Sequence, residues 1–259
     1  MIEVAANILQ LSHEAFFVGF AVFIRVGAMM VVLPLFGEQS IPVRVRIGAT
    51  LAFTVIVAPT LFDVAQLAPQ NIIDFFRVIG PEVVVGLLFG LALRFFVFAL
   101  QVAGAIAAQS TSLSQIFGGS AGVDPQPAMG RILVVAGLAL AALSGVNVQV
   151  TLFIIHSYAM VPLGVLISAE SVMALGVEEV SKAFAFGFTL SAPFVVASLI
   201  YNVTLGVINR AMPQLMVSFV GAPAITAGGL LLMMIVAPVL LSIWLAAFND
   251  FLANPFGPA

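Results

Sequence analysis

The sequence predicts an all-α protein made of membrane-associated helical hairpins and broken long helices. Hydrophobic residues make up 63% of its 259 residues, and charged residues make up only 7%. Soluble domains have about 45–50% apolar and about 25% charged residues. The composition therefore indicates an integral membrane protein or a subunit buried in an apolar assembly. Glycine and proline inside the longest apolar stretches indicate the breaks.

The composition also excludes several function classes. The chain has no cysteine, so it has no disulfide, thiolate metal site or cysteine nucleophile. Its eight cations include one lysine, Lys182, and make no basic patch for nucleic acid. Neither a P-loop nor an HExxH sequence occurs. We therefore expect no catalytic residue, no cofactor, no metal site and no nucleic-acid partner.

The apolar stretches define the helices that we expect. They are 15–36, 47–62, 78–108, 132–167, 183–208 and 215–248. A spanning helix needs about 20 apolar residues, so the second stretch is short and the third, fourth and sixth are too long for one simple pass. The N-terminus lacks the positive region of a signal peptide, so we expect the first stretch to be retained.

Breaks and turns are expected where glycine, proline and small polar residues interrupt these stretches. Pro42 marks a turn in the first connection, 37–46, and the second connection is 63–77. Expected breaks inside the long stretches are Ser144-Gly145 with Asn147, Pro162 with Gly164, Gly221 with Pro223, Gly228-Gly229 and Pro238. Loop charges weakly favour an outward N-terminus, with inner cations Arg44, Arg46, Arg131 and Arg210 and outer cations Arg77 and Lys182.

The helix at 78–108 carries the most information. Pro81 suits its first helical position, and Glu82 would then lie in the first turn, where the helix dipole favours an anion. At 100° per residue, a stripe of small and polar residues falls within an arc of about 80°. The stripe contains Gly86, Gly90, Arg94, Gln101, Gly104 and Ala108. It is interpreted either as a close-packing face or as a face toward a polar conduit.

The segment 109–131 stands between two very apolar stretches and differs from both. It contains four glycines, two prolines and several small hydroxyl residues, and its only charges are Asp124 and Arg131. Glycine and proline predict that no helix continues through 117–126. The segment is too uncharged for an ordinary solvated linker. We expect an ordered or semi-ordered loop that packs against protein or lines a cavity.

Four ionisable residues lie inside apolar stretches and are candidate functional groups: Arg25, Glu82, Arg94 and His156. Glu82 and Arg94 lie on different faces of one helix and should not pair with each other. Each arginine needs acceptors from other helices or other chains, or it is a buried arginine bonded to carbonyl groups. His156 is more simply interpreted as a packing residue than as a ligand. A small-solute or ion secondary transporter is the alternative function, since transporters also use broken helices.

Four motifs occur along the chain in a specific order. They are RVGAMMVVLPLFGEQSIPVRVRIG at 25–48, GPEVVVGLLFGLALRF at 80–95, AQSTSLSQIFGGSAGVDPQ at 108–126 and NRAMPQLMVSFVGAPA at 209–224. Together they resemble the FliR family of flagellar type III secretion export-gate proteins, called SctT in injectisomes. The resemblance covers essentially the whole chain, in order.

The resemblance implies a non-enzymatic structural and gating subunit of a bacterial inner-membrane protein export channel in the flagellar basal body. One copy joins FliP and FliQ subunits around a pore for unfolded polypeptides, beside FlhB-like and FlhA-like proteins and membrane lipid. Residues 1–182 then correspond to a FliP-like part and 183–259 to a FliQ-like hairpin. A third interpretation is a passive packing subunit of the export channel without a gating role.

The resemblance also implies site residues. The family's pore plug falls on 110–122, with Phe117 at its centre, and its members here are Leu113, Ile116, Phe117, Gly118, Gly119 and Gly122. Arg94 and Gln101 would line or brace the conduit. The cytoplasmic tip near FlhB would be Asn209, Arg210, Pro213 and Gln214.

Overall fold

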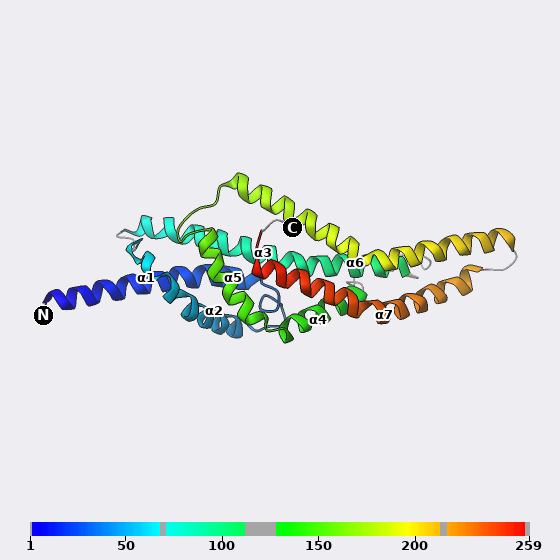
Figure 1. Cartoon of the computed structure of the whole chain (residues 1–259), viewed down its shortest axis with the longest axis horizontal. Helices are drawn as coiled ribbons and strands as arrows, with labels where there is room; N and C mark the ends of the chain where they lie inside the picture. The colour runs from blue at the N-terminus through cyan, green and yellow to red at the C-terminus, as the bar shows by residue number, and fades with distance from the viewer. Residues whose placement is uncertain (1, 68–70, 112–127, 213–216, 257–259) are drawn as a thin grey trace. The chain divides into compact units, whose positions relative to one another are not determined.

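The chain forms seven α-helices and one 3₁₀ helix among the residues that the computed structural model describes, which are 2–67, 71–111, 128–212 and 217–256. No strand occurs within these ranges, as the sequence predicts. In chain order the elements are α1 (Ile2–Val32), α2 (Val43–Val57), η1 (Ala58–Leu67), α3 (Ile72–Thr111), α4 (Ala128–Leu143), α5 (Val146–Met160), α6 (Ala169–Ala211) and α7 (Val217–Ala253) (Figure 1).

Five of these helices are long and apolar enough to cross a membrane, and a sixth span is added if α4 and α5 form one broken pass. α4 and α5 meet at an angle of 82°, at the break expected from Ser144-Gly145. Gly145 has a φ of 78°, a left-handed conformation that glycine adopts without the steric cost of a side chain. The break expected at Pro162 is also confirmed, because α5 ends at Met160.

Several helices begin before the apolar stretches that predicted them, with α1 at Ile2, α3 at Ile72 and α6 at Ala169. α3 begins at Ile72, so the expectation that Pro81 opens this helix is wrong. The extra turns are stabilised by Phe75, whose ring lies 6.1 Å from that of Phe17 and 5.7 Å from that of Phe20 in α1. α6 begins at Ala169, where the Ser168 hydroxyl accepts a hydrogen bond from the Ser171 amide at 3.1 Å, the geometry of a helix N-cap.

The prediction of breaks in the last apolar stretch, 215–248, is wrong. α7 runs without interruption through Gly221, Pro223, Gly228-Gly229 and Pro238. Membrane helices tolerate glycine and proline because neighbouring groups satisfy the backbone positions that these residues free. Pro193 is likewise inside α6, and Pro81 is inside α3.

The chain divides into two compact units. The first comprises Met1–Phe95, Ala142–Glu179 and Phe248–Ala259, and the second comprises Phe96–Ala141 and Val180–Ala247. The chain passes from one unit to the other inside α3, α4, α6 and α7, so each of these helices contributes to both units. These units do not follow the division at 182/183, and the relation of 1–182 and 183–259 to two other protein families stays a prediction.

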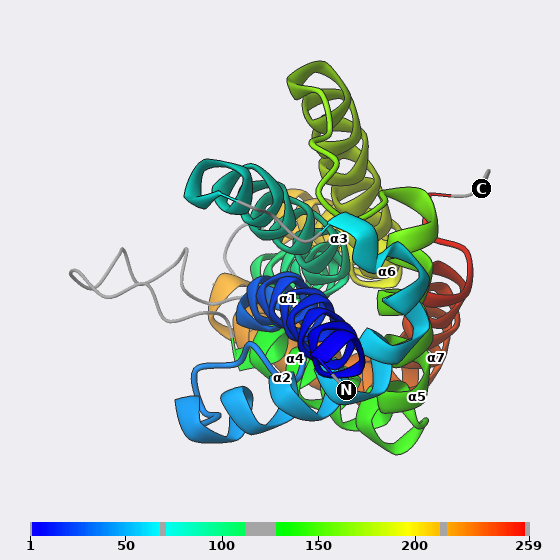
Figure 2. The same ribbon diagram turned by 90° about the vertical axis from the view of Figure 1, so that its left-hand side faces the viewer.

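The first unit is built around α1, which contacts both α2 and η1 (Figure 2). One face of α1 is almost completely inaccessible to solvent, with spacings of three and four residues that place its members on one side of the helix. This face consists of Val18, Ala21, Val22, Arg25, Val26, Met29 and Met30. A charged residue, Arg25, therefore lies in the middle of an apolar face.

The second unit is built around the C-terminal half of α3. The fully buried Trp244 of α7 donates its indole N–H to the carbonyl of Phe96 at 2.8 Å. On α6, Gly187 brings the backbone close to α3, since a Cβ placed there would lie 2.9 Å from the carbonyl oxygen of Ala99. α4 also meets α3 closely, at Gly130 and Gly104. The second unit therefore packs α4, α6 and α7 against one central helix.

Candidate functional site

A buried ion pair lies at the centre of the first unit. The Arg25 Nε atom donates to Glu82 Oε2 at 2.7 Å, and Arg25 Nη2 donates to Glu82 Oε1 at 2.9 Å. Both side chains are 0% exposed. This two-bond arrangement is the fork-to-fork geometry that makes arginine–carboxylate pairs strong and directional.

The remaining hydrogen-bonding groups of this pair are also used. Arg25 Nη1 donates to the carbonyl oxygen of Val161 at 3.0 Å and to that of Ser157 at 3.3 Å. Glu82 accepts from the Tyr158 hydroxyl at 3.3 Å and from the Gly164 amide at 2.9 Å. The guanidinium also lies 3.7 Å from the centre of the Tyr158 ring. A buried charge is tolerated when its partners are complete, and here α1, α3, α5 and the turn after α5 supply them.

Two glycines make this arrangement sterically feasible. Gly86, one turn after Glu82, faces the backbone of α1, and a Cβ there would collide with the carbonyl oxygen of Arg25. Gly164 has a φ of 76°, and a Cβ there would lie 3.1 Å from Val78. A residue with a side chain would be strained in this backbone conformation and crowded by Val78, so glycine suits the position from which the amide reaches Glu82.

The sequence identified the two charges but not their partnership. Arg25 finds its acceptors in this chain, and Glu82 lies inside α3 rather than in its first turn. Glu82 and Arg94 do not pair with each other, as their helical positions predict. The sequence did not connect Ser157, Tyr158 or Gly164 with this pair. It did show that Arg25 and Glu82 are opposite charges in apolar stretches, where each requires a partner, and this could have indicated that they pair with each other.

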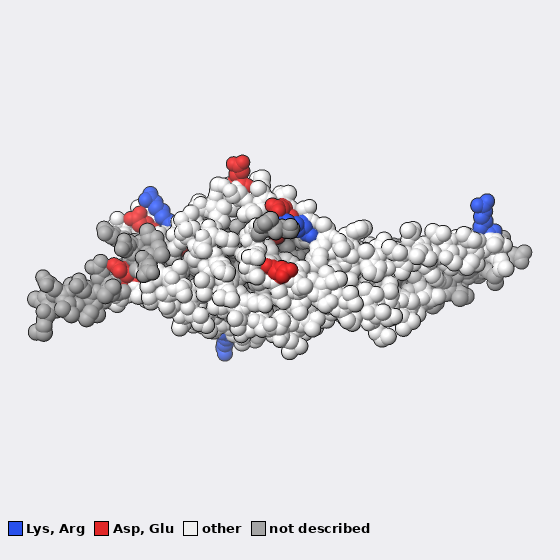
Figure 3. All heavy atoms as spheres, in the orientation of Figure 1, with Lys and Arg blue, Asp and Glu red and all other residues white. Residues whose placement is uncertain are grey.

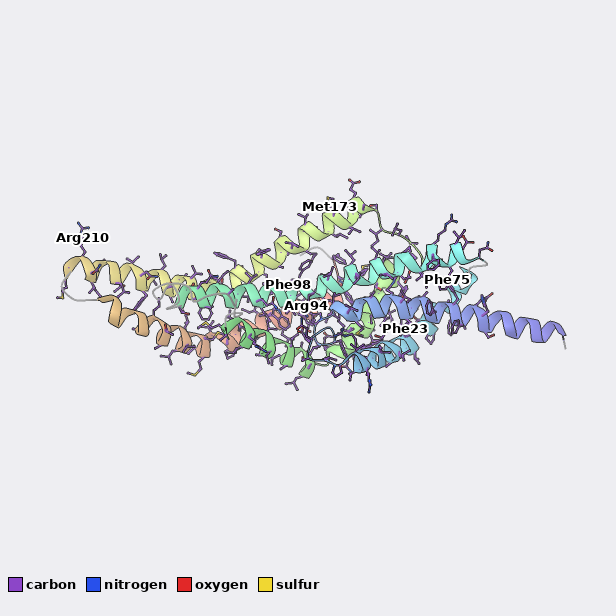
Figure 4. All side chains as sticks on the ribbon, turned by 180° about the vertical axis from the view of Figure 1, so that it is seen from behind. Phe23, Phe75, Arg94, Phe98, Met173 and Arg210 are labelled. Atoms are coloured by element: carbon purple, nitrogen blue, oxygen red, sulfur yellow. The ribbon has the colours of Figure 1, made fainter. Side chains whose placement is uncertain are left out.

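A second charged group holds the turn between α1 and α2. Arg94 of α3 forms an ion pair with Glu38, and the two side chains are 21% and 24% exposed. Arg46 of α2 donates to the carbonyl oxygens of Phe36 at 3.0 Å and Glu38 at 3.2 Å. Arg94 therefore braces this turn through Glu38, a partner that the sequence did not single out (Figure 4).

The described members of the small and polar stripe on α3 lie at helix contacts. In the first unit, a Cβ on Gly86 or Gly90 would meet α1, at the carbonyl oxygens of Arg25 and Met29 respectively. In the second unit, a Cβ on Gly104 would collide with the backbone of Gly130 in α4. Gln101 is half-buried. The contacts of the three glycines agree with the interpretation of the stripe as a close-packing face. A role of the stripe in lining a conduit stays a prediction.

Other expected site residues lie at the edges of the described structure. Asn209 and Arg210 are exposed near the end of α6, where Arg210 points away from the helix (Figure 4). Pro213 and Gln214 lie outside the described residues. So do all the expected plug residues, Leu113, Ile116, Phe117, Gly118, Gly119 and Gly122. His156 is exposed on α5.

The face of the molecule drawn in Figure 3 carries few charged side chains, and most of its described surface is uncharged. In α6 and in α7, only 22% of an apolar stretch of 18 residues is buried within the chain, against 50% of such a stretch in α3. Among the described residues, no cluster of three or more histidine or acidic side chains has the arrangement of a metal site. The fold and its buried charges thus define a polytopic membrane protein whose outer surface is apolar.

Comparison with known proteins identifies its family. The family described as "Bacterial export proteins, family 1" matches residues 16–251. Several similar proteins bear the name "Flagellar biosynthetic protein FliR". One from Caulobacter vibrioides is 29% identical over 237 residues, which cover 91% of this chain and 94% of the relative. The Escherichia coli protein is 25% identical over 84% of this chain and 83% of its own length, and the Bacillus subtilis protein is 28% identical over 78% and 79%.

The chain belongs to the FliR family of bacterial export proteins. It is a membrane-embedded component of the flagellar export apparatus.

Proposed function

We propose that this chain is a structural and gating subunit of the flagellar type III protein export channel. With FliP-like and FliQ-like subunits it forms the pore through which unfolded flagellar subunits cross the bacterial inner membrane, within the flagellar basal body. The chain carries out no bond chemistry, and the energy comes from partner proteins and the proton gradient. FlhB-like and FlhA-like proteins complete the path of the exported polypeptide.

The observation that supports this proposal best is the uncovered apolar surface of the second unit. Large apolar side chains are exposed on both long helices of that unit, including Leu199, Ile200 and Val203 of α6 and Leu231, Met234 and Ile235 of α7. Soluble monomers rarely expose apolar patches of more than a few hundred Å², so larger ones mark protein or membrane contacts. Lipid and neighbouring subunits with similar helices are the partners that such surfaces fit.

The internal charges support a scaffold rather than a solute-binding site. Arg25 and Glu82 have their hydrogen-bonding groups occupied by one another and by neighbouring groups of the same chain. A transporter uses buried polar groups that remain available to a solute or coupling ion. The buried charges of the first unit instead fix helices to one another.

The gate is assigned to residues 110–122, and the stripe on α3 leads toward it in sequence. Leu113, Ile116 and Phe117 supply apolar bulk, and Gly118, Gly119 and Gly122 supply conformational freedom. In this proposal Arg94 and Gln101 line or brace the conduit. The tip formed by Asn209, Arg210, Pro213 and Gln214 faces the cytoplasm and contacts an FlhB-like protein.

Co-purification tests the proposed assembly. The tagged chain, expressed with FliP-like and FliQ-like subunits from the same bacterium, is expected to elute in detergent as one stable complex that contains all three. Expressed alone, it is expected to aggregate or degrade, because its apolar faces lack their partners. Subunit content is measured by native mass spectrometry. A monodisperse protein that forms alone and binds a small solute, with no retained FliP-like or FliQ-like subunit, contradicts the proposal and favours a secondary transporter.

A further inference from the structure

The C-terminal end of α3 is held by α7 in the second unit. The hydroxyl of Thr226 in α7 donates to the backbone carbonyl oxygen of Thr111 at 3.1 Å. Thr111 is the last residue of α3 that the structure describes, and it is only 5% exposed. The bond from Thr226 therefore joins a side chain of α7 directly to the backbone of α3.

One turn further along α7, Gly229 contacts the same residue. A Cβ placed on Gly229 would lie 2.6 Å from the Cβ of Thr111, so any side chain there would push the two helices apart. Residues three apart share one face of a helix, so Thr226 and Gly229 act on Thr111 from the same side of α7. The Thr111 hydroxyl itself donates to the carbonyl oxygen of Ala107 at 2.9 Å, within α3.

α4 holds the same two turns of α3 from another direction. The Thr111 hydroxyl lies 3.8 Å from the sulfur of Met129, and Gly104 meets Gly130 at the backbone. The contacts differ in strength. A backbone-to-backbone helix contact allows close packing over several residues. One neutral hydrogen bond contributes only about 0.5–1.5 kcal/mol net, so loss of the bond between Thr226 and Thr111 alone costs little.

We propose that Thr226 and Gly229 form a latch that holds the end of α3 while export is off, and that α7 must move away from Thr111 for export. This inference rests on the proposed gating function. Residues 112–127 begin directly after Thr111, so the position of Thr111 sets where that segment starts. α7 begins at Val217, shortly after the proposed partner tip at 209–214, so a partner that moves the tip acts close to the helix that carries the latch.

A side chain added to α7 tests whether separation from Thr111 opens the latch. Gly229→Ala places a Cβ 2.6 Å from the Cβ of Thr111, so it is expected to move α7 away from Thr111 and to raise the ion conductance of the purified complex. Gly228→Ala is the matched control, because a Cβ there meets nothing within 4 Å. It should leave the conductance unchanged.

A milder variant tests the hydrogen bond itself. Thr226→Val removes the donor but keeps the shape of the side chain. Ion conductance of the purified complex is expected to rise about 2–10-fold, the change that loss of one hydrogen bond gives in a two-state equilibrium. Thr204→Val is the matched control, because the Thr204 hydroxyl bonds only within α6, to the carbonyl oxygen of Ile200 at 2.8 Å.

The outcomes separate the latch from the gating function. Equal conductance of Gly229→Ala and Gly228→Ala overturns the latch, and so does equal conductance of Thr226→Val and Thr204→Val. The gating function fails separately, if the wild-type chain forms no complex with FliP-like and FliQ-like subunits.

Discussion

Glu82→Ala is expected to lower the free energy of unfolding by about 3–5 kcal/mol, the cost of breaking one side of a buried ion pair. The substitution leaves Arg25 fully buried without its carboxylate, and it leaves the Tyr158 hydroxyl and the Gly164 amide without their acceptor. The measurement is unfolding of the tagged chain within the purified complex in mixed dodecylmaltoside and sodium dodecyl sulfate micelles, followed by loss of the chain's protection from protease. We also expect less folded protein to accumulate in membranes.

Two further variants make this result specific to the buried pair. The double variant Arg25→Met with Glu82→Met removes both charges and should recover part of the lost stability, because no buried charge remains unpaired. Asp74→Ala breaks the exposed pair of Asp74 and Arg77, whose side chains are 46% and 76% exposed. Exposed pairs contribute about 0–1 kcal/mol. A Glu82→Ala variant as stable as Asp74→Ala would show that the buried network does not stabilise the fold.

Gly104→Leu is expected to separate α3 from α4 and to lower the free energy of unfolding by at least about 1–3 kcal/mol. A side chain at this position meets backbone atoms of Gly130, which cannot rotate out of its way as a side chain can. The same micelle unfolding experiment measures the effect. Gly206→Leu is the control, since a Cβ at Gly206 meets nothing within 4 Å and leucine favours a helix more than glycine does. Equal stability of the two variants would rule out close α3–α4 packing at Gly104.

The sequence predicted the broken helix pair correctly because the break has a local cause. Ser144-Gly145 combines a small polar residue with a glycine that takes a left-handed conformation, and no neighbouring helix is needed to explain it. Glycine and proline alone were poor predictors elsewhere. In α7 the same residue types lie inside an uninterrupted helix. Whether glycine or proline breaks a membrane helix depends on the groups around it as well as on the residue type.

The sequence also located the buried charges but not their partners, for a physical reason. Arg25 and Glu82 are 57 residues apart, and their contact depends on how α1 packs on α3. Gly86 permits that approach, but its spacing along one helix shows only that a close contact exists and not which helix makes it. The start of α6 was predictable in principle, because Ser168 precedes the helix in an N-cap position.

The intrachain pairing of both arginines changes the expected nature of the assembly contacts. The sequence left open whether the acceptors of Arg25 and Arg94 belong to this chain or to other chains, and the structure pairs Arg25 with Glu82 and Arg94 with Glu38 within this chain. We therefore infer that contacts with neighbouring subunits depend mainly on apolar surface. Such contacts weaken little with ionic strength, since salt screens charges and not apolar burial.

Ion conductance of the purified complex in a planar bilayer tests the gating role most directly. The complex with the wild-type chain is expected to be closed, and deletion of residues 114–119 or the substitution Phe117→Ala is expected to open an ion-conducting path. Phe16→Ala is the matched control, because Phe16 is 74% exposed on α1 and has no proposed role in the gate. It should leave the complex closed. Conductance that stays at the wild-type level after the 114–119 deletion would contradict the gate and leave a passive packing subunit as the better account.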